Sequence, residues 1–564
     1  MKDFILKNYK YIIVILITVI IMSFFINKKE GFHEDEIFSY GSSSFLYDNV
    51  FRPYGVEDAT GIFIRNYILK GNIIKNLKYY YIDNTPEKDR IIEQYENEQK
   101  PIWKTKDDAH DYITINSWRE AINYIIPYYN QSKDVHPPLF YLAVHTVQII
   151  FYARFTKYIV FSINIIFMVL SLIKLKQMFE KIDKEYLAVP AMILYGFSIG
   201  AISTVIFQRM YMMLTFFVLS FISINLDVIK NDFEIDKKTW IKLGVITLLG
   251  YLTQYYFCIF AVGVIGIIFA NICRKKNKKK IISFVLNYLK IALIGLALYP
   301  FSINHIFFSY RGVGVSEMHK SFIQKLGSYL NLIGYSYSVS VLIIGLIIIA
   351  MIVYLIVKRK QELELNKYIL LLLLPSFLYI IIITKTAPEV EYRDTIRYIM
   401  CLLPVFAILC VLGLDMFIKN KKVSQILLSC TFLAVSVYGI TSNEPFALFK
   451  GYNKYIEIAN NNKDDRFVYV GDTVFNHIQS MPEFAIYKGS LILNDEQIDY
   501  LIENEELKNE NEFIISIKKY KDYQNIINRI TNETDFKEYE LLLDDSGDIS
   551  CIIYRMKRSN KNEV

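Results

Sequence analysis

The stretch "GFHEDEIFSY" at residues 31–40 places three carboxylates beside a histidine, directly after the first apolar run of the chain. A carboxylate acts as a general base on a hydroxyl group when it lies within hydrogen-bonding distance. Asp35 and Glu36 are therefore the candidate catalytic residues, and His33 is a candidate for substrate binding. The alternative is that the acidic residues form a solvated cap at the start of a helix. For Glu34 we favour this alternative.

Further polar residues interrupt the apolar sequence at widely separated positions. Arginine suits phosphate groups, because its guanidinium forms paired hydrogen bonds with their oxygens. Each of these residues also has a structural explanation, such as a helix cap, a contact with lipid headgroups, an interfacial aromatic belt or an Arg–Asp pair that locks a loop. The motifs are "KDVHPPL" (133–139), "FQRMY" (207–211), "TQYY" (253–256) and "EYRDTIRY" (391–398), and their candidate substrate-binding residues are His136, Arg209, Tyr211, Gln254, Tyr255, Arg393 and Arg397. The histidines without a partner pattern, which we interpret as structural, are His145, His305, His319 and His477.

Composition indicates an integral membrane protein. The chain has 564 residues, of which 53% are hydrophobic and 15% aromatic, and its mean hydropathy is +0.27. A soluble globular protein of this length does not need so much apolar surface. The net charge of +7 lies in short basic clusters that report membrane topology, so we expect no nucleic-acid partner. The six cysteines form no CxxC pair, so we expect neither a disulfide framework nor a zinc site.

The apolar runs predict eleven membrane-crossing helices, because a crossing needs about 20 apolar residues. Basic clusters follow alternate runs, and the positive-inside rule makes each cluster cytoplasmic. The N-terminus is then cytoplasmic, the C-terminus is extracytoplasmic, and the candidate residues all fall on the outer face. The predicted crossings are 11–27, 157–175, 187–206, 211–229, 240–255, 256–273, 281–302, 338–357, 368–386, 397–418 and 423–441.

One apolar run breaks this alternation. Residues 137–153, "PPLFYLAVHTVQIIFYA", look like a crossing. If the first loop (28–136) is outside and the basic cluster at 174–184 is inside, only one of the runs 137–153 and 157–175 crosses. We therefore expect 137–153 to lie in the interface or to be re-entrant. The alternative is a true crossing here and a miscounted weak helix elsewhere.

The C-terminal part of the chain has a different pattern. We expect a membrane domain over 1–442 and an extracytoplasmic α/β domain over 443–564. Strand-length apolar runs alternate with helical patterns in the second part, which indicates a small, partly parallel sheet. The predicted strands are 466–471, 484–489, 512–517, 539–543 and 551–556, and the segment 544–550 is typical of a hairpin turn. The turn at 471–477 suggests a helix cap at Asp472 or Thr473.

A carboxylate base, cations for phosphate and a membrane location together suggest transfer from a lipid-phosphate donor. The logic is that of an inverting displacement, in which one carboxylate activates the nucleophile on the face opposite the leaving group. Here the nucleophile is an acceptor hydroxyl. Asp35 is the expected base, and Glu36 is expected to orient the acceptor or a neighbouring cation.

The order of the motifs resembles the GT-C superfamily of integral-membrane glycosyltransferases. "DE" follows the first helix, "HPPL" comes about a hundred residues later, and "RMY" and a helix-opening "RY" come after it. The resemblance covers about residues 1–440 and is greatest to the branch that holds the protein O-mannosyltransferases and the lipid A aminoarabinose transferase. It implies an all-helical bundle with juxtamembrane helices in the first loop, a polyprenyl-phosphate sugar donor, and a catalytic base that maps onto Asp35.

The chain departs from this pattern in one place. Some relatives carry a further acid before the "RMY" equivalent, but residues 203–213 contain none. We therefore expect no cofactor and no obligatory metal, although a divalent metal is left open. The expected partners are the lipid-linked donor, membrane lipids, and an acceptor that is a protein, a glycolipid or a cell-wall polymer. Two alternatives to the transferase are a transporter or flippase of a lipid-linked or anionic substrate, and a membrane scaffold without catalysis.

Overall fold

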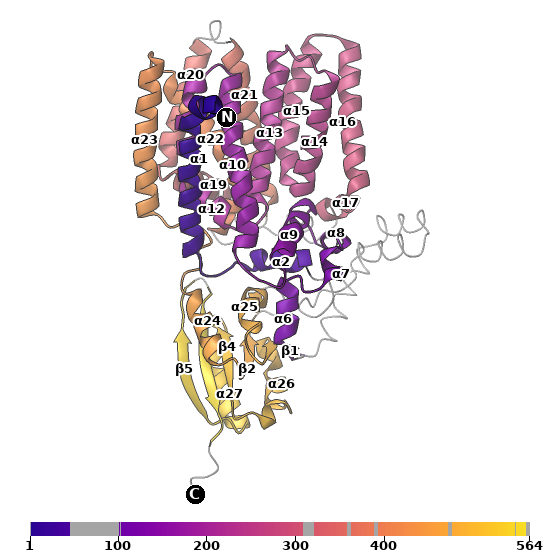
Figure 1. Cartoon of the computed structure of the whole chain (residues 1–564), viewed down its shortest axis with the longest axis vertical. Helices are drawn as coiled ribbons and strands as arrows, with labels where there is room; N and C mark the ends of the chain where they lie inside the picture. Colours follow the sequence, from indigo (N-terminus) through magenta and orange to yellow (C-terminus); the bar gives the residue numbers. More distant parts are fainter. Residues whose placement is uncertain are drawn as a thin grey trace, which may run out of the picture. The chain divides into compact units, whose positions relative to one another are not determined.

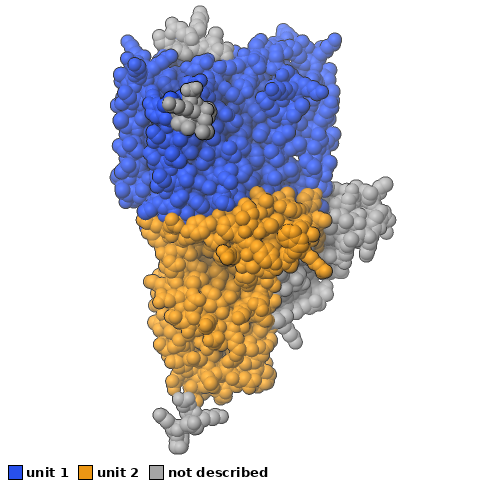
Figure 2. Space-filling model, in the orientation of Figure 1, with its two compact units in different colours: residues 1–26, 134–140, 160–446 blue, residues 27–133, 141–159, 447–564 orange. Residues whose placement is uncertain are grey.

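The computed structural model describes residues 2–44, 101, 103–132, 134–307, 321–357, 363–387, 393–471, 476–547 and 549–559. The chain forms two compact units, each assembled from segments that are far apart in the sequence. The first unit comprises residues 1–26, 134–140 and 160–446, and the second comprises residues 27–133, 141–159 and 447–564 (Figure 2). The acidic stretch and the C-terminal segment therefore belong to the same unit.

The first unit is built from apolar helices, and α13, α14, α15 and α16 run side by side within it (Figure 1). Helices that are apolar on all sides suit a lipid environment, and large apolar side chains such as Ile20, Leu293 and Ile356 face outward. The helices of this unit are α1 (Lys2–Lys28), α10 (Tyr158–Lys181), α11 (Ala188–Gly196), α12 (Ile199–Ile206), α13 (Tyr211–Lys230), α14 (Lys237–Thr253), α15 (Tyr256–Arg274), α16 (Lys278–Leu298), α17 (Ser302–Phe307), α19 (Phe322–Tyr337), α20 (Val341–Val357), α21 (Leu363–Thr386), α22 (Leu403–Asp415) and α23 (Lys421–Ser442).

The described helices match only part of the eleven crossings that the sequence predicted. Among the described residues, seven helices are long and apolar enough, or nine if each of two bent pairs is one crossing. The expected count of eleven is therefore not confirmed. The predicted crossing 240–255 corresponds to α14, which has only 17 residues. The crossing 397–418 starts with two 3₁₀ helices, η4 (Asp394–Tyr398) and η5 (Met400–Leu402), so α22 has only 13 residues.

The two bent pairs break the helix at polar or left-handed residues. Between α11 and α12 the chain bends by 62°, where the Ser198 side chain accepts a hydrogen bond from the Ala201 amide and starts a new helix. Between α19 and α20 it bends by 94°, and α19 ends at Ser338 with φ 55°. Residues 139–150 form the short helix α9 (Leu139–Ile150), whose 12 residues are too few to cross the hydrocarbon core. This length supports the prediction that the run 137–153 does not cross.

The second unit combines the helices of the first loop with a mixed sheet. Its strands lie in the order β1-β3-β2-β4-β6-β5, with β2 parallel to β3 and β4 and the other pairs antiparallel. The edge strand β1 comes from the first loop, so this loop and the C-terminal segment contribute to one sheet. The strands are β1 (Lys104–Thr105), β2 (Arg466–Val470), β3 (Gly489–Leu493), β4 (Glu512–Lys518), β5 (Glu538–Asp544) and β6 (Cys551–Lys557). The described helices of four or more residues are α2 (Glu34–Ser44), α6 (Lys106–Ile113), α7 (Trp118–Ala121), α8 (Ile125–Ser132), most of α9 (Leu139–Ile150), α24 (Tyr452–Asn461), η6 (Asn476–Ser480), α25 (Met481–Phe484), α26 (Ile498–Ile502) and α27 (Tyr523–Glu533).

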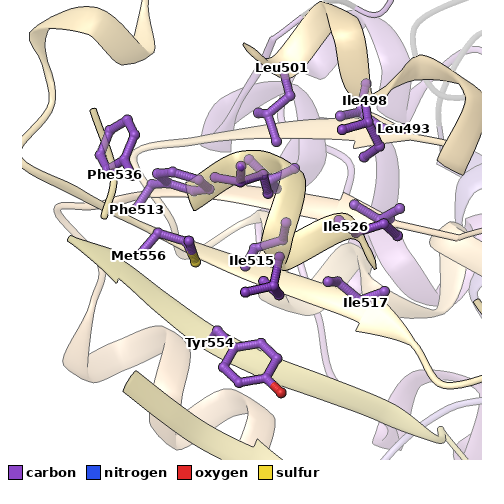
Figure 3. Packing of buried hydrophobic residues seen from close by; sticks show 14 of the residues in the cluster. Leu493, Ile498, Leu501, Phe513, Ile515, Ile517, Ile526, Phe536, Tyr554 and Met556 are labelled. Carbon is purple, nitrogen blue, oxygen red and sulfur yellow. The ribbon is translucent and has the colours of Figure 1, made fainter. Parts of the chain in front are cut away.

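The sheet buries an apolar core that the sequence pattern predicted well. Alternating side chains of β4 and β6 pack against α26 and α27, as Figure 3 shows for Phe513, Ile515 and Met556. The predicted partly parallel sheet and the hairpin of β5 and β6 are confirmed. The predicted strand 484–489 is wrong, because this segment leaves the helical turn α25 and β3 begins only at Gly489. Its aromatic residues are buried by stacking instead, with Tyr487 parallel to Phe467 at 4.4 Å.

Candidate active site

The acidic stretch forms the first turn of α2, and we refer to residues 29–36 as the acid turn. His33 caps this helix, because its Nδ1 accepts a hydrogen bond from the Asp35 amide (3.0 Å). In return, Glu36 Oε2 accepts the His33 amide (2.7 Å). This reciprocal pair has the form of a capping box with histidine in place of serine or threonine. The partial positive charge of the helix start favours the three acids of the turn.

The cap also indicates the tautomer of a neutral His33 ring. Since Nδ1 accepts a hydrogen bond, the proton of the neutral ring lies on Nε2, which is 3.5 Å from Glu34 Oε1. His33 Nδ1 also lies 3.9 Å from Asp35 Oδ2. The Asp35 side chain keeps 22% of its surface exposed, so an incoming hydroxyl can reach the carboxylate.

Glu36 is oriented away from solvent and forms a buried ion pair. Its Oε2 lies 2.9 Å from Lys29 Nζ, and neither side chain is exposed. Burial of a charged pair is costly unless further hydrogen bonds satisfy it. The His33 amide and the Ala447 carbonyl provide these bonds, the latter at 2.5 Å from Lys29 Nζ. Glu36 therefore pairs with a neighbouring cation and fixes the geometry of the acid turn.

In the first unit, the "HPPL" and "RMY" motifs meet in one chain of polar contacts. Asp134 Oδ2 lies 3.0 Å from His136 Nδ1, and His136 Nε2 lies 3.4 Å from Arg209 Nη2. The carboxylate accepts the Nδ1 proton, so Nε2 is left to accept a hydrogen bond from the guanidinium. Arg209 precedes α13 and is only 2% exposed. His136 therefore acts as a neutral link that orients a buried cation.

A second group of polar side chains continues from this chain. The Tyr299 hydroxyl donates to the His136 carbonyl (3.4 Å), and the rings of Tyr299 and His305 lie 5.8 Å apart. His305 Nδ1 lies 2.9 Å from the Tyr255 hydroxyl. The structure thus connects Tyr255, a predicted site residue, to His136 through two residues that the motifs did not include.

Tyr211 and Arg397 converge on Tyr329 of α19. Tyr329 lies within electrostatic range of the Arg397 guanidinium and of the Tyr211 hydroxyl. Arg397 is only 7% exposed, and its guanidinium lies 5.3 Å from the ring of Tyr398. Tyr211 stacks on Phe207 at 5.8 Å. A buried guanidinium among tyrosine hydroxyls is suited to bind an anionic group.

The remaining two predicted residues have more local surroundings. Gln254 lies between α14 and α15, where its Oε1 accepts the amide of Tyr255 (2.8 Å) and its side chain is buried. This contact lies within the turn between the two helices. Arg393 is exposed and directly precedes η4.

Over the ranges that the structure describes, no group of three or more His, Cys, Asp or Glu side chains is arranged to hold a metal ion.

Comparisons with known proteins yield structural similarities but no sequence match. No protein-family model matches the chain, and no curated protein sequence matches it. Among solved structures, the crystal structure of ArnT from Cupriavidus metallidurans in the apo state is 10% identical, with a TM-score of 0.44. The match covers 74% of this chain and 87% of that chain.

Four residues of the site were not predicted, and each is a partner of a predicted one. Lys29 pairs with Glu36, and Asp134 pairs with His136 from within the same motif. Tyr299 and His305 lie in the sequence beyond any motif. Of the four, only Asp134 could have been found from the sequence, because its charged side chain lies two positions before His136. His145 is buried, and its ring nitrogens lie 2.6 Å and 3.2 Å from the carbonyl oxygens of Ser43 and Ala121. His477 is also buried. His319, Asp472 and Thr473 lie outside the described residues.

Proposed function

We propose that the chain is a membrane glycosyltransferase of the GT-C type. It moves a sugar from a polyprenyl-phosphate donor to an acceptor hydroxyl with inversion, and Asp35 is the general base. The observation that carries the proposal is the position of Asp35. Its partly exposed carboxylate lies in the first helical turn after α1, while the carboxylate of Glu36 beside it is already paired.

The reaction follows from the residues in simple steps. Asp35 accepts the proton of the acceptor hydroxyl, and the oxygen attacks the anomeric carbon on the face opposite the phosphate. The new C–O bond forms as the bond to the phosphate oxygen breaks, and the electron pair leaves with polyprenyl phosphate. Arg209 and Arg397 bind the phosphate and stabilise its developing charge. We assign His136, Tyr211, Gln254, Tyr255 and Arg393 to substrate binding with these arginines, and His33 and Glu36 to the environment of the base.

The position of the base after a spanning helix suits a lipid-anchored donor. The polyprenyl chain stays in the bilayer, so the reacting carbon stays near the membrane surface. A carboxylate that follows α1 by a few residues reaches this depth without the entropic cost of closing a long loop.

We place the N-terminus in the cytoplasm, and the acid turn and the C-terminal sheet outside. A cysteine introduced at the exposed residue Asn509 should react with a membrane-impermeant maleimide on intact cells. Reaction only after the cells are permeabilised would contradict this orientation.

The experiment that tests the function is a donor screen. Purified full-length protein in detergent is incubated with a panel of polyprenyl-phosphate sugars and hydroxyl acceptors, and released polyprenyl phosphate is measured. At least one donor should be consumed with the protein and not with Asp35→Asn. If every donor is bound and none is consumed, a transporter or flippase becomes the better explanation, and lipid movement in proteoliposomes would then be measured.

A further inference from the structure

The acid turn is held in place by the C-terminal segment of its own unit. Every residue from 29 to 33 contacts either residues 447–452 or Gln479. We refer to residues 447–452 and Gln479 as the C-terminal cradle. The contacts involve side chains, main-chain groups and close packing, so they constrain the turn in several directions at once.

Hydrogen bonds hold the first two residues of the turn. Lys29 Nζ donates to the Ala447 carbonyl (2.5 Å) and lies 5.0 Å from the centre of the Phe449 ring. The Glu30 amide donates to the Leu448 carbonyl (2.9 Å). Glu30 Oε2 in turn accepts the Gly451 amide (2.7 Å). The turn and the cradle thus each supply donors and acceptors to the other.

Packing and one side-chain amide hold the next three residues. A Cβ atom added at Gly31 would lie 2.8 Å from Tyr452 Cβ, so the two segments approach as closely as a glycine permits. Gln479 Nε2 donates to the Phe32 carbonyl (2.8 Å), and the Gln479 side chain is buried. The rings of His33 and Phe449 lie 6.1 Å apart. His33 then passes this constraint to Asp35 through the hydrogen bond to its amide.

The cradle has an unusual backbone that is suited to this contact. Ala447 and Phe449 have φ values of 69° and 48°, and Gly451 has 93°. Residues other than glycine rarely adopt this left-handed conformation, and they keep it only where the surrounding structure imposes it. Within residues 447–451, three residues have a positive φ. This backbone orients the Ala447 and Leu448 carbonyls and the Gly451 amide toward residues 29 and 30.

We propose that the C-terminal cradle is a positioning element for catalysis, and that Gln479 is its principal positioning residue. Gln479 fixes the Phe32 carbonyl, and through His33 it fixes the direction of the Asp35 carboxylate. This inference rests on the proposed function, in which Asp35 is the base. A displacement of about 1 Å at a reacting group can lower the rate by about 100-fold, even when the change is remote from the chemistry.

The test replaces the donor amide of Gln479 by an apolar group of similar length. Gln479→Met should lower kcat by about 10–100-fold and leave the KM for the lipid donor unchanged. The matched control is Gln497→Met, because Gln497 lies in the same sheet domain and its Oε1 accepts the Asn494 amide. The control should keep the wild-type kcat. If Gln479→Met does not fold, Gly31→Ala disturbs the same contact from the side of the turn and should have the same effect.

Two further measurements separate this inference from the proposed function. In an Asp35→Asn background, Gln479→Met should cause no additional loss, because it acts through Asp35. Hydrogen exchange of the amides at 28–38 should accelerate in Gln479→Met and not in Gln497→Met, and this readout requires no activity. Unchanged exchange and unchanged kcat would overturn the positioning role while leaving Asp35 as base. An inactive wild-type protein with accelerated exchange in Gln479→Met would overturn the proposed function and keep the contact.

Discussion

Each unit positions a charged group of the candidate site, but the contacts that do so differ between the two units. In the first unit, Arg209 is held by another side chain, since His136 links it to Asp134. In the second unit, the turn that carries Asp35 is held by hydrogen bonds that main-chain carbonyls accept, those of Ala447, Leu448 and Phe32. The side-chain arrangement keeps a cation buried. The main-chain arrangement sets the direction of a carboxylate that stays exposed.

The difference matters for the consequences of substitution. A buried cation that loses its partner leaves an uncompensated charge, so the cost appears both in binding and in folding. A turn fixed through its main chain tolerates the loss of one side chain at its tip. We therefore expect Asp35 variants to fold and bind donor normally, while Arg209 variants lose donor binding.

The largest expected effect is at the tip of the acid turn. Asp35→Asn keeps the shape of the side chain and removes its basicity. Turnover should fall by about 10²–10⁴-fold, the usual effect of a lost general base, while donor binding stays near normal. The measurement is the rate of polyprenyl phosphate release at saturating donor, with Glu34→Gln as the control. Wild-type turnover in Asp35→Asn would mean that the acidic stretch is only a helix cap.

The next effect is at the buried arginines. Arg209→Ala and Arg397→Ala should weaken use of the donor by about 2–5 kcal/mol, because each removes a charge from a desolvated phosphate contact. Use of the acceptor should change less. The measurement is the apparent affinity for the lipid-phosphate donor, and the control is Arg274→Ala at the exposed end of α15. If both variants keep the wild-type affinity, these arginines do not bind phosphate.

The smallest expected effect concerns the pH dependence of the protein's stability. Burial raises the pKa of Glu483, in α25, to about 7. Above its unfolded pKa, the unfolded state releases this proton first, so the free energy of unfolding should fall as the pH rises from about 4.5 through 7. In wild type this decrease in the free energy of unfolding should reach up to about 3 kcal/mol at pH 8. Glu483→Gln should lack the decrease at pH 8 and have little effect at pH 4.

Melting temperatures of the full-length protein at pH 5 and pH 8 measure this difference. The matched control is Glu503→Gln, because Glu503 is exposed in the same domain. A pH dependence that is the same in wild type and Glu483→Gln would mean that Glu483 is charged throughout the range.

The sequence predicted the features that depend on local patterns. Apolar runs of about 20 residues identified the long helices, and strand-length apolar runs around Phe513 and Met556 identified the core strands. Local patterns failed where tertiary contacts decide the outcome. The segment 484–489 has the apolar pattern of a strand, but its aromatic residues Phe484 and Tyr487 pack against Phe467 from the end of α25 and the loop that follows it. The bend at Ser198 comes from one side-chain cap inside an otherwise continuous apolar run.

The site residues show the same limit. Asp35, His136 and Arg209 became candidates because charged and polar residues are costly at membrane depth. Their partners were not, because sequence spacing says nothing about which distant segment arrives beside them. Gln479 lies 447 residues after Phe32 along the chain, in a segment with no motif. The pairing of Lys29 with Glu36 spans only seven residues, but it needs the Ala447 carbonyl to complete it.

The span between the acid turn and its cradle has a consequence for biosynthesis. Lys29 leaves the ribosome 418 residues before Ala447, and at about 5–20 residues per second this interval lasts about 20–80 seconds. Throughout that time the nascent chain can insert its helices, but residues 29–33 have no cradle to dock against. The proposed base acquires its native surroundings only when translation is almost complete. A prematurely terminated chain would therefore carry Asp35 in an unassembled turn, which couples catalytic competence to a full-length product.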